Sequence, residues 1–381
     1  MKNTTVLISG ASIAGPALAF WLARYGCTVT VVERAATLRP GGQAVDFKGA
    51  THRTVLTRMG ILDEVRERQT GGTDQTIIDE NGKRLAMIPR EFTGGEIEIR
   101  RGDLAELLYS RTSSSCEYLF GDTITSLTDT QEGVHVTFAR TAPRTFDLVV
   151  GADGIHSNVR RLAFGPESDY VRHLGHYYAL ADLGDIGAES VMYNEPGRMA
   201  ALGGPKSPAF FVFASPQLSY DREDTLQQKA ILQEAYANGG WRIPELMAAV
   251  PDAAEFYLDS LSRVEMTSFT RGRVALTGDA AYGNTLGGFG TGLAVVAAHV
   301  LAGELMTADG DYRVAFGEYN AQFRSYAKIS HKGNAGPFLA PPTRMRMRAR
   351  NWMFNSSLML RMMLKMTDKL ATDIDLRSYP A

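Results

Sequence analysis

The chain has 381 residues, 44% of them hydrophobic and 22% charged, with a formal net charge of −2. This length predicts about two domains, and the near-neutral charge gives no overall attraction to nucleic acid or to a membrane surface. The only two cysteines, Cys27 and Cys116, form no C-x-x-C pair, so we expect neither a disulfide framework nor a metal site.

The N-terminal segment runs directly into an apolar strand. It lacks the basic start, the long apolar core and the cleavage site of a signal peptide. We also find no apolar run of the ~18 residues that a membrane span requires. The sequence therefore predicts a cytoplasmic protein without membrane contact.

The first predicted unit is a strand, a helix and a second strand. Residues 5–8 form a β-branched run, residues 15–25 have helical composition, and residues 27–33 form an apolar strand that ends in an acid. A unit of about 30 residues with this order is typical of dinucleotide-binding βαβ folds.

The turn inside this unit, GASIAG, carries the first and last glycines of a G-x-G-x-x-G motif. Gly10 suits a tight turn and Gly15 suits close helix packing, but Ser12 replaces the middle glycine. A serine nucleophile elbow needs G-x-S-x-G, and here the second glycine comes one place late. Glu33 lies where a carboxylate accepts ribose hydroxyls, so we predict a dinucleotide site, with a plain packing turn as the alternative.

Three further stretches follow before residue 105. The segment from Arg39 to Asp46 contains a Gly-Gly pair, and the segment from Ile77 to Ile88 predicts a hairpin around Asn81-Gly82. Arg101-Gly-Asp-Leu104 offers a guanidinium suited to a phosphate. A simple glycine turn and a helix-capping ion pair of Arg101 remain alternatives for the first and third stretches.

The middle of the chain predicts a second type of sheet. A buried strand leads to Asp153-Gly154 and then to a helix that carries Arg160. Short alternating runs between His173 and Ala214 predict an antiparallel sheet, and residues 224–237 predict a helix with Asp224 as its N-cap.

The last third begins with another buried strand, which ends at Gly278-Asp279. Four glycines between Gly287 and Gly292 and an apolar helix follow. Beyond Asn334 the segment from Thr343 to Leu370 is rich in Arg, Met and Leu. We expect a C-terminal helix that packs across both domains, with membrane contact or partner docking as alternatives.

The order of these motifs over residues 1 to about 335 resembles the single-component FAD-dependent aromatic monooxygenases, the p-hydroxybenzoate hydroxylase-like group. The stretch GGQAVDFKG, with Arg39 just before it, is most similar to the tetracycline-inactivating branch. Residues 282–286 lack the proline that many members have there. No second G-x-G-x-x-G follows a strand, so NAD(P)H is expected to visit transiently.

The resemblance implies an α/β fold: a Rossmann-like FAD-binding domain, an interleaved antiparallel-sheet substrate domain and a C-terminal helix. The implied FAD-binding domain comprises residues 1–70, 98–166 and 268–335. The implied substrate domain comprises residues 71–97 and 167–267, and residues 336–381 form the bridging helix. A monomer or a homodimer is expected.

The resemblance also implies the reaction. FAD takes hydride from NADPH or NADH, and one oxygen atom of O2 passes through a C4a-hydroperoxyflavin to an aromatic or polycyclic, tetracycline-like substrate. Such chemistry serves antibiotic resistance or aromatic metabolism and needs no side-chain nucleophile, so we assign no catalytic residue. An FAD oxidoreductase without oxygen insertion and a flavin-binding redox sensor are the alternatives.

The residues implied to contact the cofactors come from five of the stretches above: the βαβ unit, the Arg39–Asp46 segment, the Arg101 stretch, the Asp153-Gly154 turn, and the Gly278-Asp279 turn with the glycines after it. They are Gly10, Ser12, Ala14, Gly15, Glu33, Arg34, Arg39, Gln43, Asp46, Arg101, Asp153, Gly278, Asp279, Gly290, Thr291 and Gly292. Arg198, Tyr178, Phe211 and Phe213 are the expected substrate contacts. The alternative for Arg198 is an exposed position on the sheet, and for the aromatic residues it is simple core packing.

Overall fold

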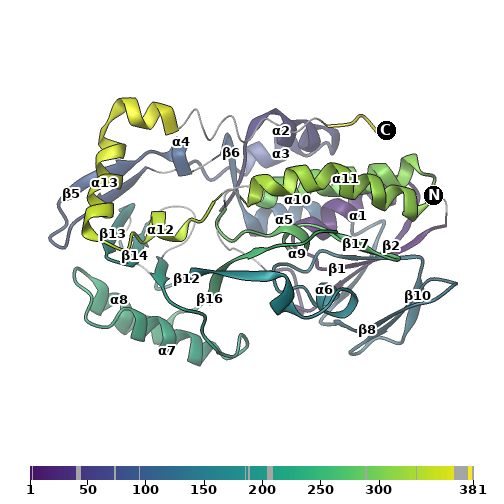
Figure 1. Ribbon diagram of the computed structural model, residues 1–381, viewed down its shortest axis with the longest axis horizontal. Coiled ribbons are helices and arrows are strands. Elements are labelled where there is room, and N and C mark those ends of the chain that lie inside the picture. Colours follow the sequence, from purple (N-terminus) through teal and green to yellow (C-terminus); the bar gives the residue numbers. More distant parts are fainter. Residues whose placement is uncertain are drawn as a thin grey trace.

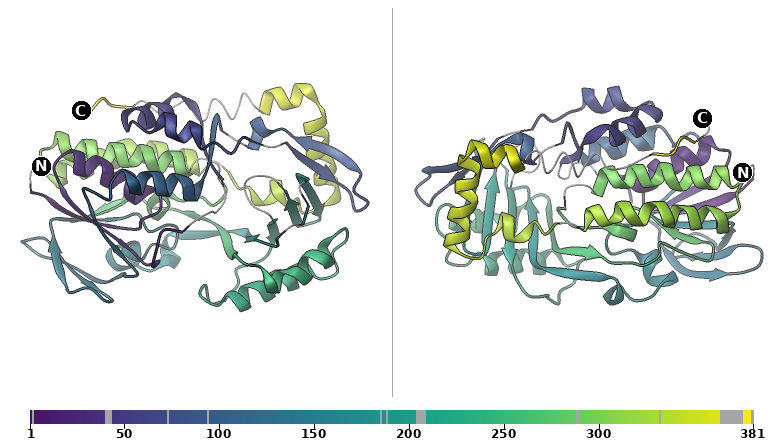
Figure 2. Two further views of the ribbon diagram at one scale, coloured as in Figure 1. Left: turned by 180° about the vertical axis from the view of Figure 1, so that it is seen from behind. Right: turned by 45° about the horizontal axis from the view of Figure 1, so that its top comes forward.

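The computed structural model describes residues 1, 3–39, 44–72, 74–93, 95–184, 186–187, 189–203, 209–287, 290–331, 333–363 and 376–379. Its elements form an elongated molecule with two sheet-centred halves (Figure 1). The two described ends of the chain lie near one end of the long axis, and the helix over residues 344–355 lies at the other end (Figures 1 and 2).

The first half is built on a six-stranded sheet in the order β17-β18-β11-β1-β2-β7. All neighbours are parallel except β17 and β18. The strands are short and apolar because both faces of the sheet are covered. Their bounds are β1 Thr5–Ser9, β2 Thr28–Glu33, β7 Glu117–Phe120, β11 Leu148–Gly151, β17 Thr270–Arg271 and β18 Val274–Leu276.

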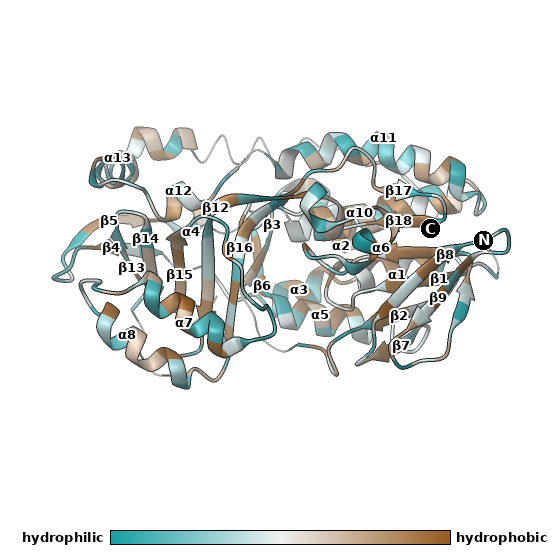
Figure 3. Ribbon diagram, turned by 60° about the horizontal axis from the view of Figure 1, so that its bottom comes forward, coloured by the Kyte–Doolittle hydropathy of each residue, from teal (hydrophilic) through white to brown (hydrophobic). Residues whose placement is uncertain are grey.

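Helices cover this sheet on both sides (Figure 3). They are α1 Ala14–Arg24, α2 Gly49–Arg58, α3 Leu62–Glu67, α5 Arg101–Ser110, α6 Asn158–Ala163, α9 Asp279–Tyr282, α10 Gly290–Thr307 and α11 Tyr312–Ser330. Helix α10 packs against α1, α2 and α11. The predicted βαβ unit is confirmed by β1, α1 and β2, which pair and pack in that order.

Helix α10 corrects one expectation from the sequence. Its 18 residues are long and apolar enough to cross a membrane, although the sequence was expected to hold no such run. In the structure 78% of this stretch is buried inside the protein. Its apolar composition therefore serves the packing of three neighbouring helices.

Smaller elements flank the six-stranded sheet. A three-stranded antiparallel sheet has the order β10-β9-β8, with β8 Ile124–Asp129, β9 Val134–Phe138 and β10 Arg144–Phe146. A two-stranded sheet pairs β3 Ala44–Phe47 with β6 Ile97–Arg100. A short 3-10 helix, η1, spans Glu167–Asp169.

The second half is a seven-stranded sheet in the order β16-β12-β15-β14-β13-β4-β5. It is antiparallel except where β13 meets β4. The bounds are β4 Gln75–Ile78, β5 Arg84–Ile88, β12 Val171–Ala181, β13 Val191–Glu195, β14 Arg198–Leu202, β15 Ala209–Ala214 and β16 Phe256–Val264. The predicted hairpin is confirmed as β4 and β5, and the predicted antiparallel sheet as β12 to β15.

The two faces of this sheet carry separate apolar clusters. One cluster packs under α7 Thr225–Ala235, α8 Ile243–Ala249 and the 3-10 helix η2 Val250–Asp252. The other lies under α4 Arg90–Thr93, α12 Gly336–Leu339 and α13 Arg344–Asn355. Figures 1 and 3 show the two groups of helices on opposite sides of the sheet. We call these faces the α7 face and the α12 face.

The C-terminal region differs from the single helix expected. Residues 336–363 contain α12, α13 and a further helical segment at 357–363, because Ser356 is extended with φ −96° and ψ 111° and interrupts the helix. Helix α13 packs on β5 of the seven-stranded sheet. The division of the chain into two domains at the boundaries given above stays a prediction.

Candidate active site

The carboxyl ends of four parallel strands meet at one edge of the six-stranded sheet. These ends are Ser9, Glu33, Gly151 and Leu276, and parallel pairing puts the residues that follow them side by side. Open sheets bind ligands in the crevice beyond the carboxyl ends of their strands. The predicted cofactor residues Gly10, Glu33, Asp153 and Asp279 all lie at this edge.

The turn after β1 requires its two glycines. Gly10 has φ +107° and donates its N–H to the carbonyl of Val32 at 2.8 Å. A Cβ on Gly10 would collide with the carbonyl oxygen of Ala152, and a Cβ on Gly15 would collide with that of Gly10. Because these are backbone contacts, no side chain fits at either position.

Glu33 fixes this turn from the neighbouring strand. Its Oε2 accepts the N–H of Ala11 at 2.8 Å, and its Oε1 accepts the N–H of Ala35 at 2.9 Å. A carboxylate has about four acceptor sites, so about two remain for ribose hydroxyls. Glu33 is half-buried, which leaves it reachable by a ligand.

Ser12 has a partner that the sequence did not indicate. Its Oγ accepts hydrogen bonds from Arg101 Nε at 3.1 Å and from Arg101 Nη2 at 2.9 Å. The serine that replaces the middle glycine thus positions the predicted phosphate-binding arginine over the turn. Arg101 is exposed, and its charge acts on the carboxyl of Asp279.

Asp279 stands at the first position of α9, beside the start of α10. Burial raises the pKa of its carboxyl, and the positive charge of Arg101 opposes that rise. The side chain is nevertheless accessible to solvent. A Cβ on Gly290 would lie 3.3 Å from Asp279 Oδ1, so α10 begins close to this carboxylate.

Small residues also allow α1, β18 and α10 to approach one another. A Cβ on Gly278, whose φ is +61°, would lie 2.9 Å from the Cβ of Ala14. A Cβ on Gly292 would collide with the imidazole of His52. Thr291 lies half-buried between the two glycines that start α10.

The carboxylate of Asp153 already has hydrogen-bond partners in the α6 segment and in β1. Its carboxylate accepts hydrogen bonds from the Ser157 hydroxyl, from the N–H of Val159 at 3.0 Å and from Ser9 Oγ at 3.4 Å. Burial raises the pKa of Asp153, and the hydrogen bond from Ser157 lowers it. These contacts indicate that Asp153 holds the start of α6 in place.

Three other predicted cofactor residues lie in the segment between the end of β2 and the end of β3. Arg34 is exposed and pairs with Glu223 at 2.8 Å, and Arg39 is exposed as well. Asp46 in β3 accepts the N–H of Gly95 at 3.0 Å. Gln43 and the Gly-Gly pair before it lie outside the described residues.

The predicted substrate residues divide between the two faces of the seven-stranded sheet. Tyr178 belongs to the α12 face. Burial and then the charge of Asp259 raise the pKa of its hydroxyl, and the charges of Arg101 and Asp279 are smaller causes that act in opposite directions. Phe211 and Phe213 point to the α7 face and pack on Tyr236 with ring centroids 5.3 and 6.2 Å away. Their placement favours the core alternative.

Arg198 also lies on the α7 side. It pairs with Glu195 at 2.5 Å, and its Nη1 donates to the carbonyls of Ala235 and Ala237 at 3.1 and 3.0 Å. These carbonyls stand at the C-terminal end of α7, where a cation is favourable. The contacts assign Arg198 to the support of α7.

A network of ionizable residues between the two sheets was missed at the sequence level. His156 Nε2 lies 3.0 Å from Asp259 Oδ2 and its Nδ1 lies 3.1 Å from Glu167, while Tyr257 donates to Asp259 at 2.8 Å. Burial lowers the pKa of His156, but the hydrogen bonds to both carboxylates outweigh it and the pKa is raised. The spacing Tyr257-x-Asp259 could have indicated this network from the sequence, because residues two apart on a strand point to the same face of the sheet.

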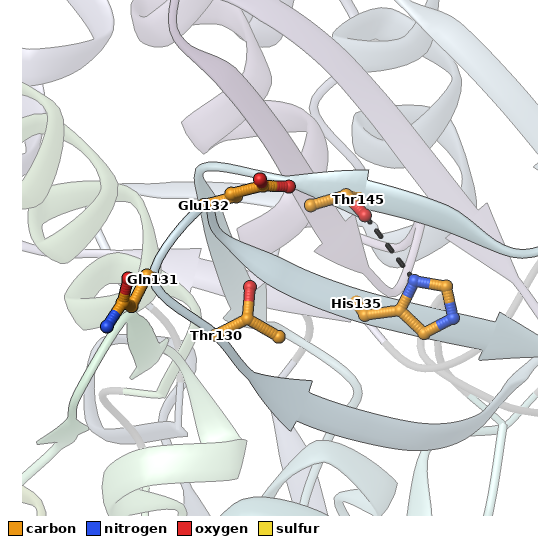
Figure 4. A pocket seen from close by; sticks show the side chains of 5 residues that line it. All are labelled: Thr130, Gln131, Glu132, His135 and Thr145. Atoms are coloured by element: carbon orange, nitrogen blue, oxygen red, sulfur yellow. Dashed lines mark hydrogen bonds between the residues drawn. The ribbon is translucent and has the colours of Figure 1, made fainter.

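A separate hollow lies on the three-stranded sheet, away from these residues (Figure 4). It is lined by Thr130, Gln131, Glu132, His135 and Thr145, and its strongest internal contact joins His135 Nδ1 to Thr145 Oγ1 at 3.4 Å. The hollow is open and polar, so it lacks the apolar walls typical of a small-molecule site.

Comparison with known proteins identifies the family. Residues 3–310 match the family described as FAD binding domain. A flavin-dependent monooxygenase of Legionella longbeachae is 36% identical over 347 residues, which cover 87% of this chain and 88% of that protein. The crystal structures of tetracycline destructases Tet(51) and Tet(55) are 29% and 32% identical, with TM-scores of 0.84 and 0.83 and full coverage of both chains. The chain therefore belongs to the FAD-binding-domain family and is an FAD-dependent monooxygenase.

Proposed function

We propose that the enzyme uses NADPH or NADH and O2 to insert one oxygen atom into a flat, polycyclic aromatic substrate of the tetracycline kind. The observation that carries this proposal is the position of Tyr178 on the α12 face. Burial and the charge of Asp259 are the main causes that raise the pKa of its hydroxyl, and the charges of Arg101 and Asp279 at the cofactor edge act on it as smaller causes. A sheet face lined by apolar side chains therefore borders the cofactor edge, as a substrate wall must.

The residues at the strand ends suit FAD. The N–H groups of Gly10 and Ala11 are bonded to Val32 and Glu33, so the pyrophosphate would meet the N–H groups of the first turn of α1 that follows them. Glu33 has acceptor sites for a ribose, exposed Arg101 offers a guanidinium for a phosphate, and Asp279 offers a carboxylate beside the start of α10. Bound FAD supplies the redox and oxygen chemistry, and the protein supplies binding and orientation.

The substrate wall that we propose is the α12 face with the segments that cover it. Phe92, Phe338 and Phe354 form a cluster with ring centroids 5.1 to 5.9 Å apart. Tyr178 contacts Phe210 and Tyr257 with ring centroids 6.4 and 5.7 Å apart. Flat apolar surfaces of this kind stack on aromatic rings and keep water from the reacting atoms.

The tetracycline-like substrate class rests on the likeness to the two tetracycline destructases along the whole chain. The absence of a second glycine motif supports a nicotinamide cofactor that visits and leaves. Arg39 is exposed and offers a positive charge to the phosphates of that nicotinamide cofactor.

The test measures NADPH oxidation and O2 uptake together with a panel of tetracyclines and polycyclic phenols. The proposal expects substrate-stimulated O2 uptake and products that gain one oxygen atom by mass spectrometry. Substrate reduction without O2 uptake indicates an FAD oxidoreductase instead. A lack of any substrate-stimulated NADPH oxidation across the panel favours a flavin-binding sensor.

A further inference from the structure

Helix α10 carries a single charged residue, Glu304, in an otherwise apolar sequence. Glu304 is 3% exposed, and most of the helix is buried around it. Burying a carboxylate is costly unless other groups donate hydrogen bonds to it. The presence of this acid in a core helix therefore calls for specific partners.

Two of those partners come from the last described residues of the chain. Glu304 Oε1 accepts a hydrogen bond from Tyr379 Oη at 2.7 Å and pairs with Arg377 Nη1 at 3.1 Å. The third partner is Gln322 Nε2 of α11 at 2.5 Å. Without the C-terminal residues, this buried carboxylate would lose two of these three donors.

Two further positions of α10 fit the same tyrosine. A Cβ on Gly303 would collide with the ring of Tyr379. The ring of His299 meets that of Tyr379 edge-on, with centroids 5.2 Å apart and an interplanar angle of 76°. Residues 299 and 303 are four apart and lie on one face of the helix, and residue 304 adjoins residue 303. The glycine, the aromatic ring and the carboxylate together form a receptor for one tyrosine side chain.

The receptor continues onto helix α2. Arg58 Nη1 lies 2.9 Å from His299 Nε2 and donates to the carbonyl of Arg377 at 3.2 Å. Burial, with the charge of Arg58 as a second cause, lowers the pKa of His299 to about 4. The imidazole is therefore neutral near pH 7 and accepts the hydrogen bond from Arg58.

The far ends of α2 and α10 reach the cofactor site. His52, near the start of α2, packs against Gly292 at the start of α10, so closely that no side chain fits at residue 292. Burial lowers the pKa of His52 to about 4, which keeps this ring neutral as well. The two helices are thus held together at the cofactor end by His52 and at the other end by Arg58 and the C-terminal residues.

We propose that residues 376–379, the C-terminal clamp, hold α10 against α2 and thereby slow the release of FAD. The clamp lies beside α2, while α13 lies at the opposite end of the molecule (Figures 1 and 2). Glu304, Gly303 and His299 are its receptor. These are positioning residues, since they act through the two helices that border the cofactor.

The experiment measures the rate of FAD release from purified holoenzyme by the recovery of flavin fluorescence, without substrate or NADPH. Tyr379→Phe keeps the ring and removes the bond to Glu304, so we expect release about two- to fivefold faster. A chain that ends at residue 375 should release FAD about tenfold faster. Arg324→Gln, which changes an exposed arginine of α11, is the matched control and should leave the rate unchanged.

A double-mutant cycle distinguishes the loss of the Tyr379–Glu304 hydrogen bond from an unspecific loss of stability. In a Glu304→Leu background the buried carboxylate is gone, so Tyr379→Phe should change the release rate much less than in the wild type. A peptide of residues 376–381 added to the shortened chain should slow release again, and the same peptide with phenylalanine at position 379 should do so less well.

Circular dichroism establishes that each variant is folded before its release rate is compared. An unchanged rate in the folded, shortened chain would overturn the proposal. An equal effect of Tyr379→Phe with and without Glu304 would overturn it too, because the clamp would then not act through this carboxylate. The assay needs no turnover, so its outcome is independent of the proposed oxygen insertion.

Discussion

Glu33 uses its two carboxylate oxygens to hold two backbone N–H groups of the nucleotide turn. Glu33→Ala removes both contacts and the proposed ribose acceptor. Because hydrogen bonds to charged groups contribute about 1.5–3 kcal/mol, we expect FAD affinity to fall roughly ten- to hundredfold. A titration of the apoprotein with FAD measures this change, and the exposed Glu132→Ala is the control. An unchanged affinity would contradict the assignment of Glu33.

Tyr178 and Phe211 lie on adjacent strands but on opposite faces of the same sheet. Phe211→Leu should lower the free energy of unfolding by about 1–2 kcal/mol, because it opens space in the α7 cluster, and should leave the substrate KM unchanged. Tyr178→Phe should preserve stability and change KM or kcat. Urea unfolding and steady-state kinetics of both variants check this. If Phe211→Leu changed the substrate KM and left the free energy of unfolding unchanged, Phe211 would be a substrate contact after all.

For single residues, the sequence predicted the glycines and acids at the strand ends, but it did not predict on which face of the seven-stranded sheet the aromatic residues lie. Gly10 and Glu33 belong to a motif with fixed spacing, so the sequence identifies them. The side chains of a strand alternate between the two faces of the sheet, and this alternation does not tell which face meets the cofactor. Phe211 and Phe213 share a face with each other, and Tyr178 pairs beside them on the other face. Only the covering helices decide between the two.

Helix α7 illustrates how local and distant signals differ at the scale of an element. Its N-cap was predictable, and Asp224 Oδ1 accepts the N–H of Gln227 at 3.0 Å. The hydrogen bonds at its C-terminal end were not predictable, because Arg198, which donates them, lies on a strand 37 residues before Ala235. The break in the C-terminal helix was missed for a different reason, because Asn355, Ser356 and Ser357 are residue types that favour turns and caps and were not read as such.

Asp224→Ala and Arg198→Gln therefore test the two ends of one helix. We expect Asp224→Ala to lower the free energy of unfolding by about 1 kcal/mol through loss of the cap. Arg198→Gln should cost a similar amount, about 1 kcal/mol, because it removes the hydrogen bonds to the last carbonyls. Thermal unfolding measures both, and neither variant should alter the substrate KM. A selective rise of KM in Arg198→Gln would restore its predicted role at the substrate.

The two halves of the molecule meet at His156, which follows the six-stranded sheet and bridges to Asp259 on β16 of the seven-stranded sheet. Its other nitrogen faces Glu167, which Arg222 also contacts at 2.8 Å. Burial alone would raise the pKa of Glu167, but the hydrogen bonds from His156 and Arg222 lower it to about 2. A protonated His156 therefore joins carboxylates of both halves.

This bridge predicts how stability depends on pH across the whole molecule. The raised pKa of His156 means that folding favours its protonated form, so its contribution is complete below the ordinary histidine pKa of 6.5 and is lost as the pH rises through the raised value. His156→Gln should cost about 2–3 kcal/mol near pH 6, because Asp259 loses a charged partner while buried. Toward about pH 9 the difference between the wild type and the variant should shrink.

Urea unfolding of both proteins across this range measures the effect, with exposed His135→Gln as the control. A difference that stays constant with pH would show that His156 is neutral in the folded protein, and the bridge would then rest on hydrogen bonds alone.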